Sequence, residues 1–198
     1  MFFLVSGSSG AGKTTIGPLV ATRIEGLVFH DADERYGEAL ESWVAQGLEY
    51  QESGRDILLS TSRPMGELLA CAEATQLTAI AGCLLDCDDL TRAHRLRARP
   101  PPNDQILDMD ILCWASWHRM HADDPGWSQH TITNNGEHRR WERWTSWRHG
   151  DPRWRVPVFD TSADTPDQTA EAVALWVAEA RANPPLHRDN RWWELGGK

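Results

Sequence analysis

The sequence lacks the features that define several large protein classes. No apolar run in the 198 residues approaches membrane length, and the one at residues 1–5 is too short, and lacks the basic start, for a signal peptide. The four cysteines form no CxxC pair and no His/Cys cluster with zinc-ligand spacing. They are typical of reduced, mostly buried thiols. We therefore expect a cytoplasmic protein with no membrane segment.

Positive charge is also scarce. Twenty Lys and Arg residues face 29 Asp and Glu residues, which gives a formal net charge of −9. Such a chain is a poor general binder of nucleic acid or of anionic membranes, although a local basic pocket remains compatible with it. The 40% hydrophobic and 25% charged residues are ordinary for a globular protein, so wholesale disorder is not expected.

Short apolar runs alternate with segments of helical periodicity. Strands are predicted at residues 2–5, 26–30, 56–60, 78–85 and 156–159. Helices are predicted at residues 16–24, 34–52, 65–75, 88–99 and 165–182. Uniformly apolar strands that alternate with helices indicate an α/β fold, a three-layer sandwich with a parallel sheet of about five strands.

The stretch from about residue 100 to 155 breaks this alternation. It contains seven of the eleven tryptophans and looks like an insertion between the fourth helix and the last strand. We therefore predict a single domain over residues 1–183 that carries this insertion as a lid or substrate region. Residues 184–198 are expected to form a polar, mobile C-terminal tail.

One motif carries specific chemistry. The segment from Gly7 to Thr14 fits GxxxxGK[ST] at every fixed position, and a predicted strand precedes it while a helix follows. Glycines let the backbone N–H groups converge on a phosphate, and the helix directs its positive end at the same anion. Lys13 would reach the β- and γ-phosphates of ATP, and the Thr14 hydroxyl would hold Mg²⁺. The candidate nucleotide-binding residues of this loop are Gly7, Ser8, Ser9, Gly10, Ala11, Gly12, Lys13, Thr14 and Thr15.

Two aspartates follow the second predicted strand. Asp31 and Asp33 fall at the carboxyl edge of the sheet, where ligands bind in open α/β folds. One carboxylate can hold the hydration shell of Mg²⁺, and the other can accept a proton from an attacking hydroxyl. The alternative is a solvated loop in which an aspartate caps a helix.

Together, the loop, the strand and the DxD pair resemble the small-metabolite kinases of the nucleoside monophosphate kinase group, such as shikimate, gluconate and adenylylsulfate kinase. The resemblance covers about residues 1–99 and 156–182. It implies that Asp31 serves Mg²⁺ and that Asp33 is the base. The segment Ser60-Thr61-Ser62-Arg63 resembles the gluconate-kinase segment of small residues before a basic one, which makes Arg63 a candidate substrate contact. The alternative for Arg63 is an ordinary surface residue.

The same resemblance extends to the predicted fourth helix and the last strand. Arg95 and Arg99 match the RxxxR pair of the lid, which packs on adenine and reaches the phosphates, whereas Arg92 and Arg97 are expected to be structural. Thr161 lies in a segment that resembles the "DTS…P" stretch against the adenine base. The alternatives are a solvated charged face at 92–99 and a simple helix start, with Thr165 as the N-cap.

The insertion has no counterpart in the short lids of those kinases. Trp114 and Trp117 recur with helical spacing, as do Trp141, Trp144 and Trp147, which favours packing between helices. The functional alternative is an aromatic wall for the acceptor. The polar residues that would accompany such a wall are His118, Arg119, His121, Arg139 and Arg140.

The sequence therefore predicts an ATP- and Mg²⁺-dependent kinase that phosphorylates a hydroxyl of a small molecule. Its predicted catalytic residues are Lys13, Asp33 and Arg99. Asp86, at the end of the fourth strand, is a weaker candidate for a Walker B aspartate. The acceptor is open among sugar acids, nucleosides, nucleotides and hydroxylated natural products, and the oligomeric state is open too. The alternatives are a non-catalytic ATP sensor or regulatory ATPase, and a polynucleotide 5′-kinase that uses Arg139 and Arg140, which the net charge disfavours.

Overall fold

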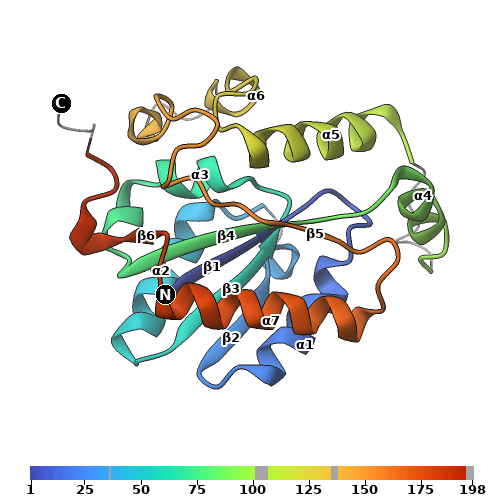
Figure 1. Cartoon of the computed structure of the whole chain (residues 1–198), viewed down its shortest axis with the longest axis horizontal. Helices are drawn as coiled ribbons and strands as arrows, with labels where there is room; N and C mark the ends of the chain where they lie inside the picture. Colours follow the sequence, from blue (N-terminus) through green and yellow to red (C-terminus); the bar gives the residue numbers. More distant parts are fainter. Residues whose placement is uncertain (36, 101–106, 135–137, 195–198) are drawn as a thin grey trace.

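A parallel β-sheet forms the centre of the molecule. The computed structural model describes residues 1–35, 37–100, 107–134 and 138–194. Five parallel strands follow the order β2-β3-β1-β4-β5 (Figure 1). They are β1 (Phe2–Ser6), β2 (Leu27–Asp31), β3 (Asp56–Thr61), β4 (Ala79–Asp86) and β5 (Val158–Asp160). The predicted α/β fold with about five parallel strands is confirmed.

Helices cover both faces of this sheet. On one face, α1 (Lys13–Arg23) lies beside α7 (Pro166–Ala182), as Figure 1 shows. The other face is covered by α2 (Leu40–Glu52), α3 (Met65–Ala70) and α5 (Met109–Asp123). The short helix α4 (Asp89–Arg97) follows β4 at the carboxyl edge of the sheet.

The alternation of side chains along β1 explains these two layers. Phe2 and Leu4 point into one core, and Phe3 and Val5 point into the other. All four side chains are at most 1% exposed, because β1 pairs with β3 on one side and with β4 on the other. Burial on both faces is why these strands read as continuous apolar runs rather than as alternating patterns.

Two predicted helices are shorter in the structure. The helix expected at residues 34–52 begins only at Leu40, after a 3₁₀ turn, η1 (Ala32–Arg35), and after Gly37, whose φ of 88° is left-handed. The helix expected at residues 65–75 ends at Ala70 and is followed by a 3₁₀ turn, η2 (Ala72–Gln76). At the break, Cys71 adopts a ψ of 134°, which a helix cannot continue through.

Among the described residues of the insertion, α5 is the longest helix. After α5 come the short helix α6 (His130–Thr133) and a single 3₁₀ turn, η3 (Trp141–Arg143), so the helix suggested by the spacing of Trp141, Trp144 and Trp147 does not form. The tryptophans themselves pack as expected. Those at most 8% exposed are Trp117, Trp144, Trp147 and Trp154, which join the core on the α2–α3 face.

The C-terminal segment is ordered over most of its length, so the expected mobile tail is wrong for residues 186–194. Leu186 and His187 form a two-residue strand, β6, antiparallel to β4, and the turn η4 (Arg188–Asn190) follows. Trp192 is only 3% exposed, in edge-to-face contact with Trp147. Among the described residues, none of the helices combines the length and the apolar character that a bilayer span requires.

Candidate active site

The carboxyl ends of the parallel strands meet at one edge of the sheet. The loop of residues 7–14, here called the glycine-rich loop, connects β1 to α1 at this edge. Gly12 caps α1 with a φ of 95°, a left-handed conformation that favours glycine. Within the described chain, the N–H groups of Gly10, Gly12, Lys13 and Thr14 have no hydrogen-bond acceptor. The loop therefore presents free backbone donors at the start of a helix, which is a suitable site for an anion.

Lys13, Thr14 and the two aspartates come together beside this loop. The Lys13 Nζ donates to the carbonyl of Gly7 at 2.8 Å, a position from which phosphate oxygens can replace the carbonyl. Thr14 Oγ1 donates to Asp31 Oδ2 at 2.8 Å, and the Asp33 N–H donates to Asp31 Oδ1 at 3.1 Å. Asp31 is 8% exposed, whereas the Asp33 side chain is exposed. Asp31 is thus fixed, and Asp33 is free to meet a substrate.

The charged form of the Lys13 side chain is disfavoured by burial. Burial lowers its pKa to about 8, although the nearby carboxylates of Asp31 and Asp33 act in the opposite direction. A bound polyanion would favour the charged form. The residues fit a nucleoside triphosphate with Mg²⁺: free N–H groups and a lysine for the phosphates, and a hydroxyl–carboxylate pair for the metal.

Arg95 and Thr161 close the far side of the loop. The Arg95 guanidinium donates to Thr161 Oγ1 at 2.8 Å and to the Gly10 carbonyl at 3.3 Å. Thr161 Oγ1 donates in turn to the carbonyl of Ala11 at 3.1 Å. These contacts border a cavity of about 300 Å³, which Arg99 also lines. The structure therefore brings the predicted RxxxR pair and the loop after β5 to the glycine-rich loop.

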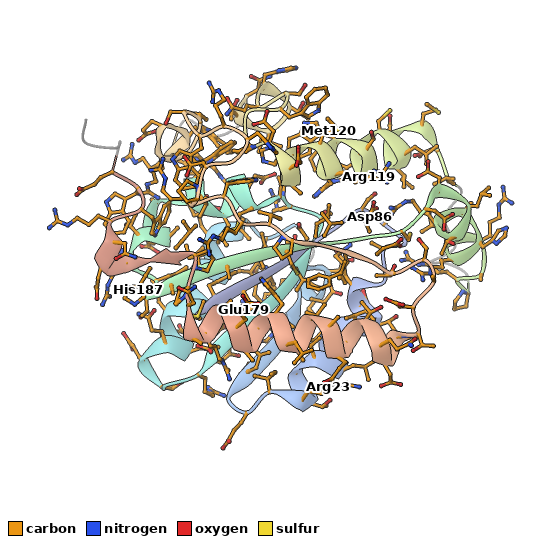
Figure 2. The ribbon with its side chains drawn as sticks, viewed as in Figure 1. Arg23, Asp86, Arg119, Met120, Glu179 and His187 are labelled. Carbon is orange, nitrogen blue, oxygen red and sulfur yellow. The ribbon has the colours of Figure 1, made fainter. Side chains whose placement is uncertain are left out.

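Asp86, the weaker candidate for a Walker B aspartate, is held by two arginines. One of its carboxylate oxygens accepts from Arg92 at 2.5 Å and the other from Arg119 at 2.8 Å. Figure 2 labels Asp86 and Arg119. Arg92 is fully buried and also donates to the Ser9 carbonyl at 2.6 Å. The expected structural role of Arg92 is thus that of a brace beneath the glycine-rich loop.

Arg63 lies just after the end of β3, at the carboxyl edge of the sheet. Its guanidinium is 43% exposed and donates to Glu67 Oε2 at 2.8 Å. Arg139, which the polynucleotide-kinase alternative needs at the surface, is only 8% exposed and paired with Glu41 at 3.1 Å. Trp144 is fully buried as well. Arg139 and Trp144 are therefore not available to the channel of that alternative, whereas Arg140 is exposed.

The contact between α5 and the end of β3 has no signal in the sequence. Trp114 Nε1 donates to the Ser62 carbonyl at 3.2 Å, and His118 Nε2 lies 3.0 Å from the same oxygen. Burial lowers the pKa of His118 to about 3, so its ring is neutral and donates to this carbonyl. The insertion is thereby tied to the segment that carries Arg63.

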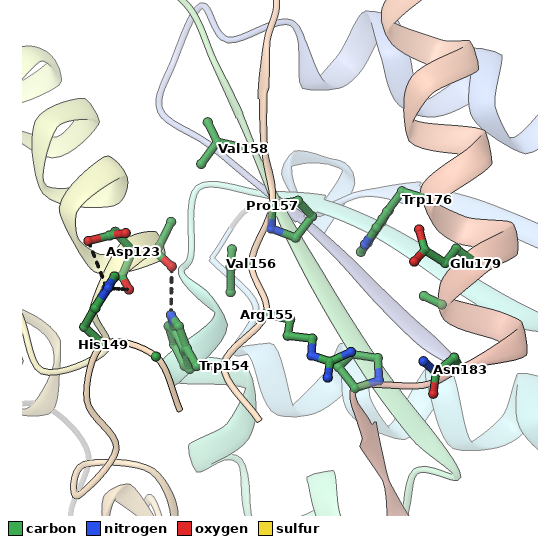
Figure 3. Close-up of a pocket in the computed structure, with 14 residues that line it drawn as sticks. Asp123, His149, Trp154, Arg155, Val156, Pro157, Val158, Trp176, Glu179 and Asn183 are labelled. Atoms are coloured by element: carbon green, nitrogen blue, oxygen red, sulfur yellow. Dashed lines mark hydrogen bonds and ion pairs between the residues drawn. The ribbon is translucent and has the colours of Figure 1, made fainter. Parts of the chain in front are cut away.

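A larger cavity lies elsewhere. It measures about 540 Å³ and is bordered by α7, the end of α5 and the chain before β5, near Trp154, Trp176 and Glu179 (Figure 3). None of the residues predicted from the sequence to form the site lines it. This cavity therefore lies apart from the residues that the sequence predicts to form the site.

Comparison with known proteins adds the fold relationship. No protein-family model matches the sequence, and no curated protein matches it significantly. Solved structures do match. A sugar kinase from Janibacter sp. HTCC2649 has a TM-score of 0.58 at 18% identity, over 91% of this chain and 96% of that one. The chain shares the fold of this sugar kinase. A gluconokinase from Sinorhizobium meliloti 1021 has a TM-score of 0.51 at 18% identity, over 91% and 94% of the two chains.

Proposed function

We propose that the protein is a kinase that transfers the γ-phosphate of ATP to a hydroxyl group of a small molecule. The observation that carries this proposal is the cluster of Lys13, Thr14 and Asp31 around the free N–H groups of the glycine-rich loop. The fold shared with a sugar kinase and a gluconokinase supports it.

In this proposal each residue has a distinct task. The loop N–H groups and Lys13 bind the phosphates, and Thr14 and Asp31 hold Mg²⁺, which would neutralise charge on the transferring phosphoryl group. Arg95 and Arg99 flank the nucleotide in the 300 Å³ cavity. Residues 100–155 form the lid and substrate region.

We assign to Asp33 the role of the general base. Its carboxylate accepts the proton of the acceptor hydroxyl while the hydroxyl oxygen bonds to the γ-phosphorus. The bond from that phosphorus to the β–γ bridging oxygen breaks, and ADP leaves with the electron pair. The exposed side chain of Asp33, beside the fixed carboxylate of Asp31, supports this division of roles.

Lys13 offers a direct test, because the chain contains only one other lysine, Lys198. An acyl-phosphate derivative of ATP should acylate Lys13, and excess Mg-ATP should protect it. Lys13→Ala should lower transfer from γ-labelled ATP to pooled hydroxylated metabolites by at least about a hundredfold, with an unchanged melting temperature. Labelling of Lys198 alone, or unchanged transfer in Lys13→Ala, would refute the proposal.

A further inference from the structure

A cavity of about 390 Å³ lies on the acceptor side of the site, in the size range of small-molecule sites. It is enclosed by the start of α2, the turn after β3, α3 and the insertion. Its side chains are of two kinds, aromatic and charged. Those used below are Glu41, Arg63, Glu67, Trp114, Arg139 and Trp141.

This cavity adjoins the glycine-rich loop through Trp114. The same tryptophan lines a neighbouring cavity of about 400 Å³ that also includes Ser8 and Ser9 of the loop. Ser62 lines that neighbour, and the next residue, Arg63, lines the 390 Å³ cavity. Trp114 therefore borders both the 390 Å³ cavity and the cavity that reaches the loop that we assign to the phosphates.

The charges around the cavity are balanced. Arg63 is paired with Glu67 at 2.8 Å, and Arg139 is paired with Glu41 at 3.1 Å and with Glu67 at 3.7 Å. Two guanidinium groups thus face two carboxylates, and the exposed His138 ring lies 3.5 Å from Glu41 Oε1 in the same wall. An acidic acceptor would add a third negative charge beside two carboxylates that already neutralise both guanidinium groups.

The Glu41 oxygen in these ion pairs has no aligned hydrogen bond. Glu41 Oε1 is buried and lies 3.1 Å from Arg139 Nε and 3.5 Å from His138 Nε2, but neither contact within the described residues has hydrogen-bond geometry. A buried acceptor atom of this kind is usually satisfied by a partner, and a ligand hydroxyl would supply one. Carboxylates accept hydrogen bonds from hydroxyl groups and gain nothing from an anion.

Trp114 and Trp141 supply the apolar part of the cavity wall. The indole of Trp114 is stacked on Trp117, with ring centroids 4.9 Å apart and planes within 4°, so its orientation is fixed. The flat face of an indole packs well against the C–H face of a saturated ring, while the ring's hydroxyls reach polar neighbours.

We infer that the acceptor is an uncharged, polyhydroxylated ring bound between Trp114, Trp141 and the carboxylates of Glu41 and Glu67. This inference rests on the proposed kinase function and narrows it. The charge balance disfavours sugar acids and nucleotides as acceptors.

The test compares matched acceptors that differ in charge. Transfer from γ-labelled ATP is measured for glucose, mannose and myo-inositol, and for gluconate, glucuronate and AMP. At least one uncharged ring should be phosphorylated, with a kcat/KM at least about tenfold above that of any acid. Preference for an acid would overturn the inference and leave the kinase function standing. Transfer to none of the six, with Lys13-dependent ATP binding intact, would also overturn it.

A variant distinguishes recognition from a general loss of structure. Glu67→Gln removes one carboxylate and releases Arg63, so the KM for the uncharged ring should rise about tenfold while the Kd for ATP stays constant. The relative kcat/KM for acids should rise at the same time. Glu73→Gln, on the exposed part of η2, is the matched control and should change none of these. Thermal melting verifies that Glu67→Gln is folded, and an unaltered preference of the folded variant for uncharged over acidic acceptors would contradict the inference. If Glu67→Gln does not fold, Trp141→Leu replaces it. The inference then requires that Trp141→Leu raise the KM for the uncharged ring.

Discussion

Different interactions hold the described parts of residues 1–99 and of the insertion at residues 100–155 in place. In the first region, most strands and helices follow the hydrophobic pattern of the sequence. In the insertion, regular structure beyond α5 is brief, and side chains hold the chain in place. The Arg143 guanidinium donates to the carbonyls of Leu69, Cys71 and Ala72, at the end of α3. A segment can thus be well packed without any periodicity that predicts its course.

The comparison also separates two tasks. The first region supplies the glycine-rich loop, the aspartate pair and the arginines of α4. The insertion supplies the aromatic wall and pins it to Ser62 through Trp114 and His118. We therefore expect changes in the insertion to alter stability and acceptor use, and changes in the first region to alter nucleotide binding and transfer.

The largest effect on stability is expected from Trp144→Ala. Trp144 is fully buried in contact with Trp154, and its loss should cost about 4 kcal/mol of unfolding free energy. Denaturant titration measures this loss, with Trp127→Ala, at a site 43% exposed, as the control. The Kd for ATP should stay within twofold. A parallel loss of ATP affinity in the folded variant would show that the two regions are not separable.

Arg92→Met should lower the stability less than Trp144→Ala does, but it should also weaken the binding of ATP. Removing the buried guanidinium leaves Asp86 with Arg119 alone, at a cost of about 3 kcal/mol. The Ser9 carbonyl loses its brace, so the affinity for ATP should fall as well. The exposed Arg97→Met is the matched control on the same helix. Loss of stability with unchanged ATP affinity would argue against the brace.

The smallest effect is the pH dependence of ATP binding. Burial lowers the pKa of Lys13 to about 8 in the free protein, and bound phosphates would raise it. Binding above pH 8 must therefore take up a proton, and the association constant should fall by up to about tenfold per pH unit, or about 1.4 kcal/mol. Calorimetry in buffers of different ionisation enthalpy measures the uptake. An association constant for ATP that does not change from pH 7.5 to 9.5 would contradict the role assigned to Lys13.

The first region was largely predictable because its signals are local. The glycine-rich loop, the aspartates at the end of β2 and the arginines of α4 are each defined by a few consecutive residues beside a clear strand or helix. Asp86 shows what such local sequence signals leave out. Its place at a strand end suggested a metal ligand, but the sequence does not show that Arg92 and Arg119 face it.

The insertion was not predictable in the same detail. The three-residue spacing of Trp141, Trp144 and Trp147 fits a helix, yet these rings pack into a core whose partners come from distant elements, including Trp192. Tertiary packing therefore overrides the local pattern. The two-residue strand β6 is likewise too short to leave a periodic signal, and it forms because β4 offers it an edge.

The central claim is that Asp33 takes the acceptor proton in a phosphoryl transfer, and one measurement tests it most directly. Single-turnover transfer of the γ-phosphate into the pooled acceptors is compared between the wild type and Asp33→Asn, alongside the Kd for Mg-ATP. A transfer rate at least about a hundredfold lower, with an unchanged Kd, is the predicted result. A rate within threefold of wild type, about 0.7 kcal/mol, would contradict it and would leave a kinase in which Asp33 is not the base.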